Sequence, residues 1–466
     1  MTFSRALLLT VAALLAACAT TSEFQRPVAP IPASWPKNWP TSSDPDAVRD
    51  AAKTHWRVFF SDPQLQALIE IALNNNRDLR IAAARVVEAR AQYGVVRADQ
   101  LPTISALGMG NSTRTPADLS GTGAAVDSNR FDASLSTVSF EIDFWGRLAG
   151  LSEAARRSYL ATEEAQRAVH LSLVADVASA YFSLVQIKEL TEQTRATLEL
   201  RRQSLALITR GKDIGATDDY VVQQASGIFD ATLANLAAIE HQGVVARNRL
   251  DYLVGKVPAN LPTGKSLDDQ GLDAQLSPGL PSEVLLLRPD VVAAEQRLMA
   301  THANVGAARA AFLPKIMLTA SLGLASQGLA GLFSSGVWAF QPIISLPIFD
   351  GGRTAANVDI AKAREVIAVA EYEKTIQLAF REVADLLSAR ESLTRQLRAS
   401  TANASAQERR LLIAQARFNG GTVGYLEVLE AQRDIVSAQQ NITQVRRSQL
   451  ESAAQLYKAL GGGAAV

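Results

Sequence analysis

The stretch IMLTASLGLASQGLAGLFSSGVWAFQPIISLPIF, residues 316–349, contains 34 consecutive residues without a charged side chain. A membrane-spanning helix needs only about 20 apolar residues, so the length of this stretch would allow one. Its composition argues against a helix, because it includes four glycines and two prolines and because apolar residues alternate with small ones at a period of two. The alternation predicts two strands joined by a turn of small residues, and Pro342 inside the second strand predicts an irregularity there.

A second stretch with a period of two lies between Pro102 and Gly146 and predicts a second pair of strands. Its alternation shifts phase near Thr137, which indicates a β-bulge. Strands of about ten residues with one apolar face are typical of transmembrane β-barrels, although periodicity alone also allows a soluble sandwich. Such barrels need about eight or more strands, and lipid does not tolerate an open sheet edge. Four strands therefore predict that several copies of the chain assemble.

The chain contains an internal repeat. Matching residues recur at an offset of 212 before the strands and of 206 after them, as in Gly94 with Gly306, Leu101 with Leu313, Gly146 with Gly352, and Leu250 with Leu456. The two offsets differ by six because the first pair of strands, with its connecting loop, is six residues longer than the second. The segment 115–129, rich in Gly, Ser, Thr and Asp, is the expected site of this insertion, because loops tolerate changes in length.

Proline is absent from 147 to 254 and from 352 to the C-terminal residue, and proline would break the interior of a helix. Apolar residues recur there at steps of three and four, the spacing of a coiled-coil seam, as at Val169, Leu173, Val177, Ala180, Leu184 and Ile187. The first of these helices would be about 95 Å long, and the two shorter helices of its repeat together nearly match it. The predicted helices are Arg77–Gln100, Arg147–Thr209, Tyr220–Val254, Pro289–Phe312, Thr354–Phe418 and Leu426–Leu460.

The composition excludes several classes of protein. The 466 residues include 46 basic and 46 acidic ones, so no net charge attracts nucleic acid. A mean hydropathy of +0.05 argues against a bundle of membrane helices. Cys18 is the only cysteine and the four histidines are scattered, so neither disulfides nor a metal site is expected. No GxSxG, HExxH or P-loop motif occurs, which makes an enzyme the least expected class and places the energy source of any transport in another protein.

The N-terminus has the features of an exported lipoprotein. An apolar run, residues 6–17, is too short to span a bilayer and ends in LAAC, which resembles a bacterial lipobox. We therefore expect residues 1–17 to be a signal peptide and Cys18 to carry a lipid, with an incidental cysteine as the alternative. Ala19 in the next position implies sorting to the outer membrane. Six prolines in residues 27–45 predict an extended arm lying along the body.

Four segments carry a resemblance to a known family: Ser139–Arg147 (SFEIDFWGR), Leu287–Glu295 (LRPDVVAAE), Ala307–Pro314 (AARAAFLP) and Tyr457–Gly462 (YKALGG). Together they resemble the TolC-type outer-membrane efflux channels, in the lipoprotein branch that includes OprM and NodT. The likeness runs from about Trp56 to Gly463. It implies a homotrimer in which three copies of four strands form one 12-stranded barrel in the outer membrane, continued in the periplasm by a tunnel of 12 helices.

The resemblance also implies a function and partners. Such a channel is a passive exit duct for small toxic compounds such as drugs, and it docks to a periplasmic adaptor protein and an inner-membrane transporter of the RND type. No cofactor is implied beyond the lipid on Cys18. The expected fold is mainly α with a small β part, and its parts are a signal peptide (1–17), a lipidated Pro-rich arm (18–62), a first repeat (63–282) with a β-hairpin at about 102–145 and an equatorial segment, and a second repeat (283–466) with a β-hairpin at about 314–350.

Leu426, Glu430 and Arg433 are spaced four and three residues apart and therefore share one helix face. At the offset of 206 their counterparts are Tyr220, Gln224 and Gly227, so the charges occur in only one repeat. In the channels that the chain resembles, residues at the three positions constrict the periplasmic end, with Asp in OprM where Glu430 stands here. The resemblance implies a periplasmic gate, and the alternative is a solvated ion pair between Glu430 and Arg433 worth a few tenths of a kcal/mol.

Two glycine-containing turns separate the long helices, at 210–219 and 417–425. The resemblance implies that they face the periplasm and meet the adaptor, through Gly211 and Gly215 in the first turn and through Gly420, Gly421 and Thr422 in the second. Ordinary turn chemistry is the alternative, because glycine at a helix end supplies a positive φ.

Two other functions stay open at this point. An exit channel for a type I protein secretion system would have the same fold, and a periplasmic coiled-coil scaffold with an apolar hairpin belongs to a different class. Loss of a secreted protein on gene deletion would favour the first, and absence from the outer-membrane fraction would favour the second.

Overall fold

A computed structural model describes residues 23–32, 54–257, 260–272 and 285–462. The expected signal peptide and Cys18 lie outside the described residues, as does part of the Pro-rich arm. The chain divides into two compact units, each made of segments that are distant in the sequence. We call them the sheet unit (1–28, 85–163 and 293–372) and the helical unit (29–84, 164–292 and 373–466).

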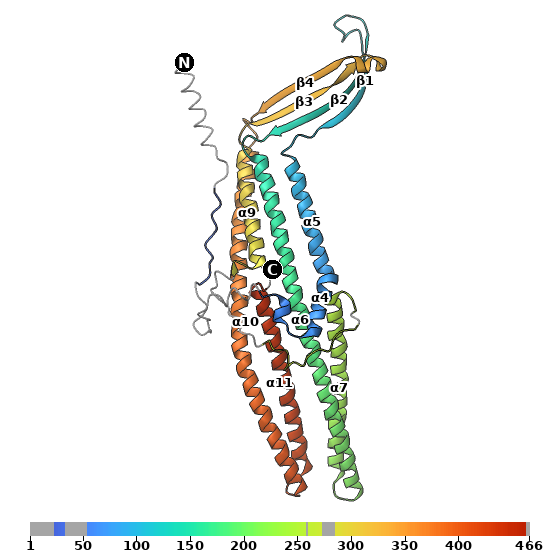
Figure 1. The fold of residues 1–466 in the computed structure, drawn as a ribbon, viewed down its shortest axis with the longest axis vertical. Helices are drawn as coiled ribbons and strands as arrows, with labels where there is room; N and C mark the ends of the chain where they lie inside the picture. The colour runs from blue at the N-terminus through green and yellow to red at the C-terminus, as the bar shows by residue number, and fades with distance from the viewer. Residues whose placement is uncertain (1–22, 33–53, 258–259, 273–284, 463–466) are drawn as a thin grey trace. The chain divides into compact units, whose positions relative to one another are not determined.

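The sheet unit contains four antiparallel strands in the order β1-β2-β3-β4 (Figure 1). Their bounds are β1 (Ser105–Thr115), β2 (Val126–Ile142), β3 (Lys315–Ser326) and β4 (Gly336–Ser345), and a short 3-10 helix, η1 (Leu329–Ser334), lies between the last two. The two predicted hairpins thus join into one sheet through β2 and β3. In this sheet β1 and β4 are the edge strands, each paired on one side only.

The predicted bulge near Thr137 is confirmed. The register between β2 and β3 shifts between Thr137 and Phe140, and Ser139 has a positive φ of 54°. The backbone N–H of Ser139 donates to the hydroxyl of Thr319, 3.1 Å away.

The irregularity expected at Pro342 was wrong. The register of β3 against β4 runs without a shift from Lys315 opposite Ser345 to Leu324 opposite Gly336, with Pro342 opposite Leu318. Proline lacks a backbone N–H, but on an edge strand one side of the backbone has no ladder to complete. The edge position of β4 therefore accommodates Pro342 without a bulge.

The segment SFEIDFWGR forms the corner between β2 and the helix that follows. The indole N–H of Trp145 donates to the carbonyl oxygen of Pro314 at 2.8 Å, which ties this corner to the start of β3. Arg147 contacts Glu141 through two hydrogen bonds of 2.7 Å each. Because the guanidinium group binds both oxygens of the carboxylate, the two side chains are held in one orientation, and this contact stabilises the corner.

Four helices enter the sheet unit: α5 (Arg77–Ala98), α6 (Arg147–Asp213), α9 (Pro289–Ala310) and α10 (Arg353–Asn419). Gly150 of α6 lets α9 approach closely, since a Cβ there would lie 3.3 Å from that of Ala307. On its other side α9 contacts α10 through His302 and Glu365, 2.6 Å apart.

Residues 23–32 contain no helix, and Arg26 pairs with the buried Glu295 of α9 at 2.6 Å. Arg26 thus ties this stretch to α9, while most of the Pro-rich segment 27–45 lies outside the described residues.

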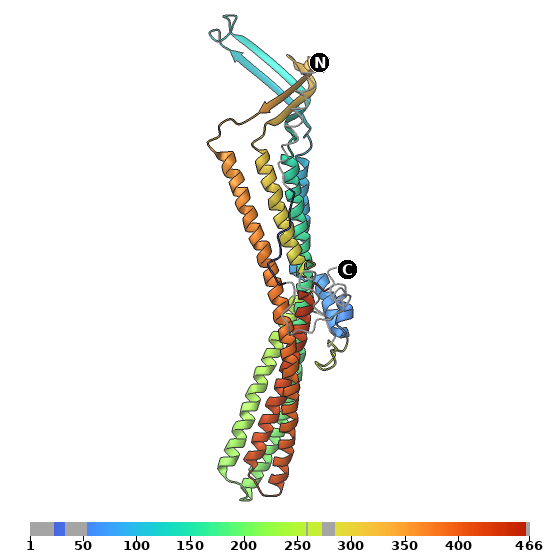
Figure 2. The same cartoon turned by 90° about the vertical axis from the view of Figure 1, so that its left-hand side faces the viewer.

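The helical unit holds the remainder of α6 and α10 together with α7 (Asp219–Val254) and α11 (Tyr425–Ala459). Figures 1 and 2 show α7 beside α6 and α10 beside α11. Polar contacts set the lateral order α7-α6-α11-α10: Arg195 with Glu240, Gln186 with Gln444, and Arg410 with Asp434. The six predicted long helices all match observed ones to within four residues at each end.

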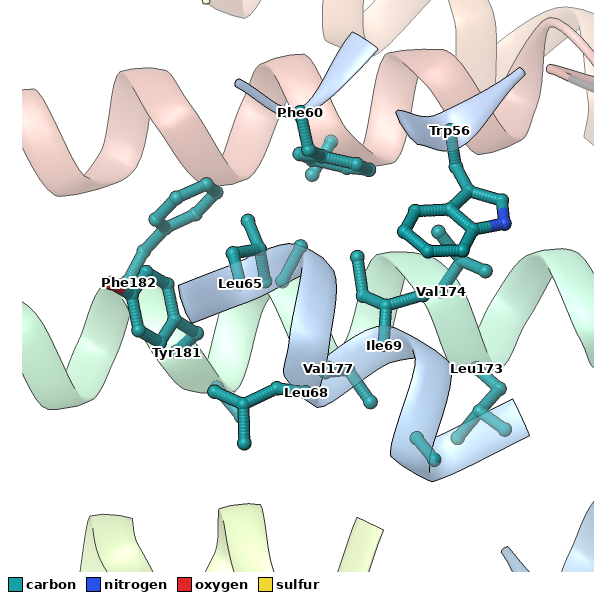
Figure 3. Packing of buried hydrophobic residues seen from close by; sticks show 14 of the residues in the cluster. Trp56, Phe60, Leu65, Leu68, Ile69, Leu173, Val174, Val177, Tyr181 and Phe182 are labelled. Carbon is teal, nitrogen blue, oxygen red and sulfur yellow. The ribbon is translucent and has the colours of Figure 1, made fainter. Parts of the chain in front are cut away.

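The core of the helical unit forms where α3 (Trp56–Phe59) and α4 (Pro63–Asn75) pack on α6 (Figure 3). Asp62 is fully buried there and caps α4 by accepting the N–H of Gln64 at 2.8 Å. It also accepts hydrogen bonds from the Tyr181 hydroxyl at 2.6 Å and the Gln270 amide at 2.8 Å. Burial acts to raise the pKa of Asp62, but its hydrogen bonds outweigh burial and lower it.

Among the described residues one helix, α6, includes an 18-residue window that is long and apolar enough to cross a membrane by length and composition alone. In that window 56% of the residues are buried inside the protein, which is typical of a core helix. The apolar side chains of this window therefore pack largely against neighbouring parts of the protein.

Candidate functional site

The two turns between the long helices, which we call the first tip (214–218) and the second tip (420–424), close with the same backbone hydrogen bonds. In the first, the N–H of Ala216 donates to the Gly211 carbonyl at 2.7 Å, and Gly215 has a φ of 76°. In the second, the N–H of Thr422 donates to the Arg417 carbonyl at 3.0 Å, and Gly421 has a φ of 69°. Both are Schellman motifs, and a positive φ explains the glycines at 215 and 421 as turn chemistry. Gly211, Gly420 and Thr422 flank them.

The side chains of the two tips differ. Lys212 and Asp219 form an ion pair of 2.5 Å across the first tip. The residues 206 positions later are Phe418 and Tyr425, whose rings meet edge to face at 5.0 Å. The same two backbone positions are therefore joined by charge at one tip and by aromatic packing at the other.

The hydroxyl of Tyr425 also reaches across to α6. It lies 2.6 Å from the hydroxyl of Ser204, so the second tip is tied to the first hairpin. The aromatic tip thus has a lateral contact that its charged counterpart does not make among the described residues.

Leu426, Glu430 and Arg433 lie on one exposed face of α11, as predicted. The alternative ion pair between Glu430 and Arg433 does not form. Arg433 instead contacts Asp434 at 3.1 Å, and Arg410 of α10 contacts the same carboxylate at 2.6 Å. Hydrogen bonds from Arg410, with a smaller contribution from Arg433, lower the pKa of Asp434. Within the described part of the chain Glu430 forms no ion pair, so its charge is free to act elsewhere.

A cavity of about 450 Å³ lies beside this face, lined by α6, α7 and α11. All three predicted gate residues line it, together with Gln224, the repeat counterpart of Glu430. The wall from α6 includes Thr194 and Arg201, both buried, which are not among the predicted site residues.

A signal for Thr194 and Arg201 was present in the sequence. They continue the apolar seam of α6 at a spacing of seven, after Ala180 and Ile187 and before Ile208. A polar residue on such a seam faces the core of a coiled coil and is unusual there.

Comparisons with known proteins match both halves of the chain. The model of the family described as outer membrane efflux protein matches residues 68–256 and 280–462. The chain is 42% identical over 454 residues to the solvent efflux pump outer membrane protein SrpC of Pseudomonas putida, covering 97% of this chain and 96% of the relative. It is 40% identical over 460 residues to the cation efflux system protein CusC of Escherichia coli O6:H1, covering 97% of each. The structure resembles the open MtrE outer membrane channel of Neisseria gonorrhoeae with a TM-score of 0.86, at 36% identity and covering 95% and 98% of the two chains.

Proposed function

Because the chain belongs to the outer membrane efflux protein family, we propose that it is the passive exit duct of a three-part efflux pump and works as a homotrimer. It is an outer-membrane efflux channel protein, located in the outer membrane and reaching into the periplasm. Its relatives include the outer membrane protein of a solvent efflux pump and a protein of a cation efflux system. We propose small toxic compounds as its cargo and no enzymatic activity, with the energy for transport supplied by an inner-membrane partner.

The observation that carries the assembly of several copies is the four-stranded sheet with two unpaired edges, and the number three is what the resemblance to the TolC-type channels implies. The outer edges of β1 and β4 have no strand partner in the described chain, and a row of unpaired backbone groups in lipid is very costly. Pairing β1 of one copy with β4 of the next removes every edge, and three copies give a closed barrel of 12 strands within the size range of such barrels.

The edges of the helical unit support the same assembly. The outer helices in its lateral order, α7 and α10, expose large apolar side chains, among them Tyr220 and Leu233 on α7 and Leu412 and Ile413 on α10. A monomer that exposed these rows to water would be prone to association. In the proposed trimer, α7 of one copy packs against α10 of the next and a tunnel of 12 helices results.

We place the gate at Leu426, Glu430 and Arg433. The support is their common exposed face beside the second tip and the absence of charge at the counterpart positions in the first hairpin. Three copies of this face around one axis would bring three Glu430 carboxylates and three Arg433 guanidinium groups together. Charges held in a narrow opening restrict the passage of solutes.

The two tips are the proposed contact with a periplasmic adaptor, through Gly211 and Gly215 in one and Gly420, Gly421 and Thr422 in the other. The support is that all five residues lie at the helix ends and that four of them, Gly215, Gly420, Gly421 and Thr422, are exposed. The proposed lipid on Cys18, the only covalent group we expect, would add a second attachment to the outer membrane.

Deletion of the gene in its host tests the function. We expect greater susceptibility to solvents, dyes or cations and full restoration by a plasmid copy. The same plasmid-borne protein should migrate as a heat-sensitive trimer from the outer-membrane fraction. Unchanged susceptibility to all three classes of compound, or a monomer in the soluble fraction, would contradict the proposal.

A further inference from the structure

Two arginines are buried in the described part of the chain, Arg288 with 6% and Arg201 with 5% of its surface exposed. Arg288 contacts the carboxylates of Asp290 at 2.9 Å and Glu382 at 2.7 Å and donates to the carbonyl oxygen of Ala459. Burial alone would lower the pKa of Arg288, but the two carboxylates outweigh it and the pKa is raised. This is the usual arrangement, because a buried charge needs a counter-charge.

Arg201 lacks such a counter-charge. Among the described residues it forms no ion pair, and its side chain donates one hydrogen bond, of 2.7 Å, to the side-chain oxygen of Gln432. Burial therefore lowers the pKa of Arg201. A guanidinium group has five N–H donors, so most of its capacity to bind a planar anion is unused.

A second polar group in the same place also lacks a partner. Thr194 lies two turns before Arg201 on α6, with 2% of its surface exposed, and its hydroxyl forms no hydrogen bond in the described chain. Both side chains line the cavity of about 450 Å³. Buried polar groups are nearly always satisfied and buried charges are nearly always paired, so a hydroxyl without a hydrogen bond and a guanidinium group without a counter-charge in one cavity point to a ligand that supplies both.

The rest of the cavity suits an organic molecule. Its volume is at the lower end of the range for small-molecule pockets, about 300–1,000 Å³. Apolar side chains from two helices, Ile228 of α7 and Leu429 and Val436 of α11, form part of the wall. The acidic residue in the lining, Glu430, is exposed and lies beyond ion-pair distance of Arg201.

We propose that this cavity binds a small organic anion, a carboxylate with an apolar body, through the Arg201 guanidinium group and the Thr194 hydroxyl. The planar fork of Arg201 can bind both oxygens of a carboxylate, and Thr194 donates a further hydrogen bond. The apolar body of the ligand packs on the side chains from α7 and α11. Because the site lies within one chain, it does not depend on the number of copies in the assembly.

The position of the site gives it a regulatory consequence, which rests on the gate proposed above. Leu426, Glu430 and Arg433 line the same cavity, so a bound anion connects the gate face of α11 to α6 and α7. Ligand binding then favours the arrangement of helices seen here and opposes any movement of α11 that opens the gate.

Fluorine NMR of the full-length channel in lipid nanodiscs tests the binding, with 4-(trifluoromethyl)benzoate as the probe and its neutral amide as the matched control. We expect saturable broadening of the benzoate signal and binding of the amide at least about tenfold weaker, since one charge-assisted contact is lost. Arg201→Met should weaken benzoate binding by about tenfold or more. Arg202→Met, at the next position and exposed in a pair with Glu199, should leave it unchanged.

Thr194→Val should weaken benzoate binding about threefold, because one hydrogen bond to the ligand is lost. Thr191→Val should leave benzoate binding unchanged, because the Thr191 hydroxyl already donates a hydrogen bond to the carbonyl oxygen of Ile187. Each variant is checked for trimer formation and melting temperature. Arg201→Met is not expected to lower the melting temperature, and Arg201→Gln replaces it if it does.

The alternative role for Arg201 is to fix the register of the α6 seam, as single polar residues do in coiled coils. Equal binding of benzoate and amide, or benzoate binding that is unchanged in both Arg201 variants, would overturn the anion site. Channel current separates the two proposals: if benzoate binds but does not reduce the current, the site stands and the gate does not.

Discussion

The first and second tips share a backbone and differ in how their side chains hold it. Both end a 67-residue helix with a Schellman motif and a glycine in the left-handed region. The first is closed by the exposed pair Lys212 and Asp219, and the second by Phe418 against Tyr425. Backbone geometry demands glycine at one position of each tip, but the surrounding positions are free to change. The comparison teaches that the repeat keeps its architecture while each copy acquires its own chemistry.

The difference extends to the helix faces beside the tips, where the largest effect is expected. Glu430→Ala combined with Arg433→Ala should raise single-channel conductance and the leak of antibiotics into cells, because the charges proposed to close the opening are removed. Planar-bilayer recording measures the first and minimal inhibitory concentrations the second.

Gln224→Ala, at the counterpart of Glu430 in the first hairpin, is the control and should change conductance little. If the double variant conducts like the unchanged protein, the asymmetry between the hairpins has no role in gating.

A second pair of variants probes what the tips share. Gly215→Val and Gly421→Val should each destabilise their own tip by about 1–2 kcal/mol, because a side chain in the left-handed region clashes with the backbone. Hydrogen exchange of the tip amides reports this locally. Gly227→Val, inside α7 where no atom would contact the added Cβ, is the control and should not accelerate exchange at either tip. If the tip amides exchange at the same rate in all three variants, the positive φ at positions 215 and 421 does not constrain the turns.

A third comparison separates aromatic packing from charge. Phe418→Ala should cost about 1 kcal/mol of local stability at the second tip, because the ring is partly buried against a small apolar cluster around Ala414 and Val428. Lys212→Ala at the matching position of the first tip should have little effect, since exposed ion pairs contribute almost nothing. Hydrogen exchange measures both, and a larger effect for Lys212→Ala would reverse this interpretation.

The smallest effect is a response to pH. The hydrogen bond from Lys212 lowers the pKa of Asp219. A carboxylate with a lowered pKa in the folded state contributes stability above its unfolded value, about 3.9, and loses it as the pH falls through the folded value. Amide shifts of the first tip should therefore change only in acid, and Asp219→Asn should abolish the change. A shift that persists in Asp219→Asn would assign it to another group.

Much of the fold was predictable because it depends on local patterns. Period-two alternation indicated both pairs of strands, and the absence of proline indicated the long helices. The phase slip at Thr137 even identified the bulge, since one extra residue inverts which side chains face which way. Pro342 was misinterpreted because the pattern within a strand does not reveal whether the strand lies at the edge of the sheet.

The candidate site was less predictable. Leu426, Glu430 and Arg433 share a face by helical spacing alone, but spacing also suggested an ion pair that Asp434 prevents by binding Arg433. Thr194 and Arg201 lie on α6, more than 220 residues before the gate face, and a chain-local pattern cannot pair them with α11. Their place on the apolar seam was visible, but the cavity beside them was not.

The sequence by itself determined the periods, the breaks and the turn glycines of this protein, since these follow from sterics and burial within a few consecutive residues. Only the tertiary structure decided which groups lack a strand partner or a counter-charge among the described residues: the outer edges of the sheet, the Glu430 carboxylate and the Arg201 guanidinium group. Whether a polar group is satisfied depends on every residue that packs around it, and those residues come from helices far apart in the chain.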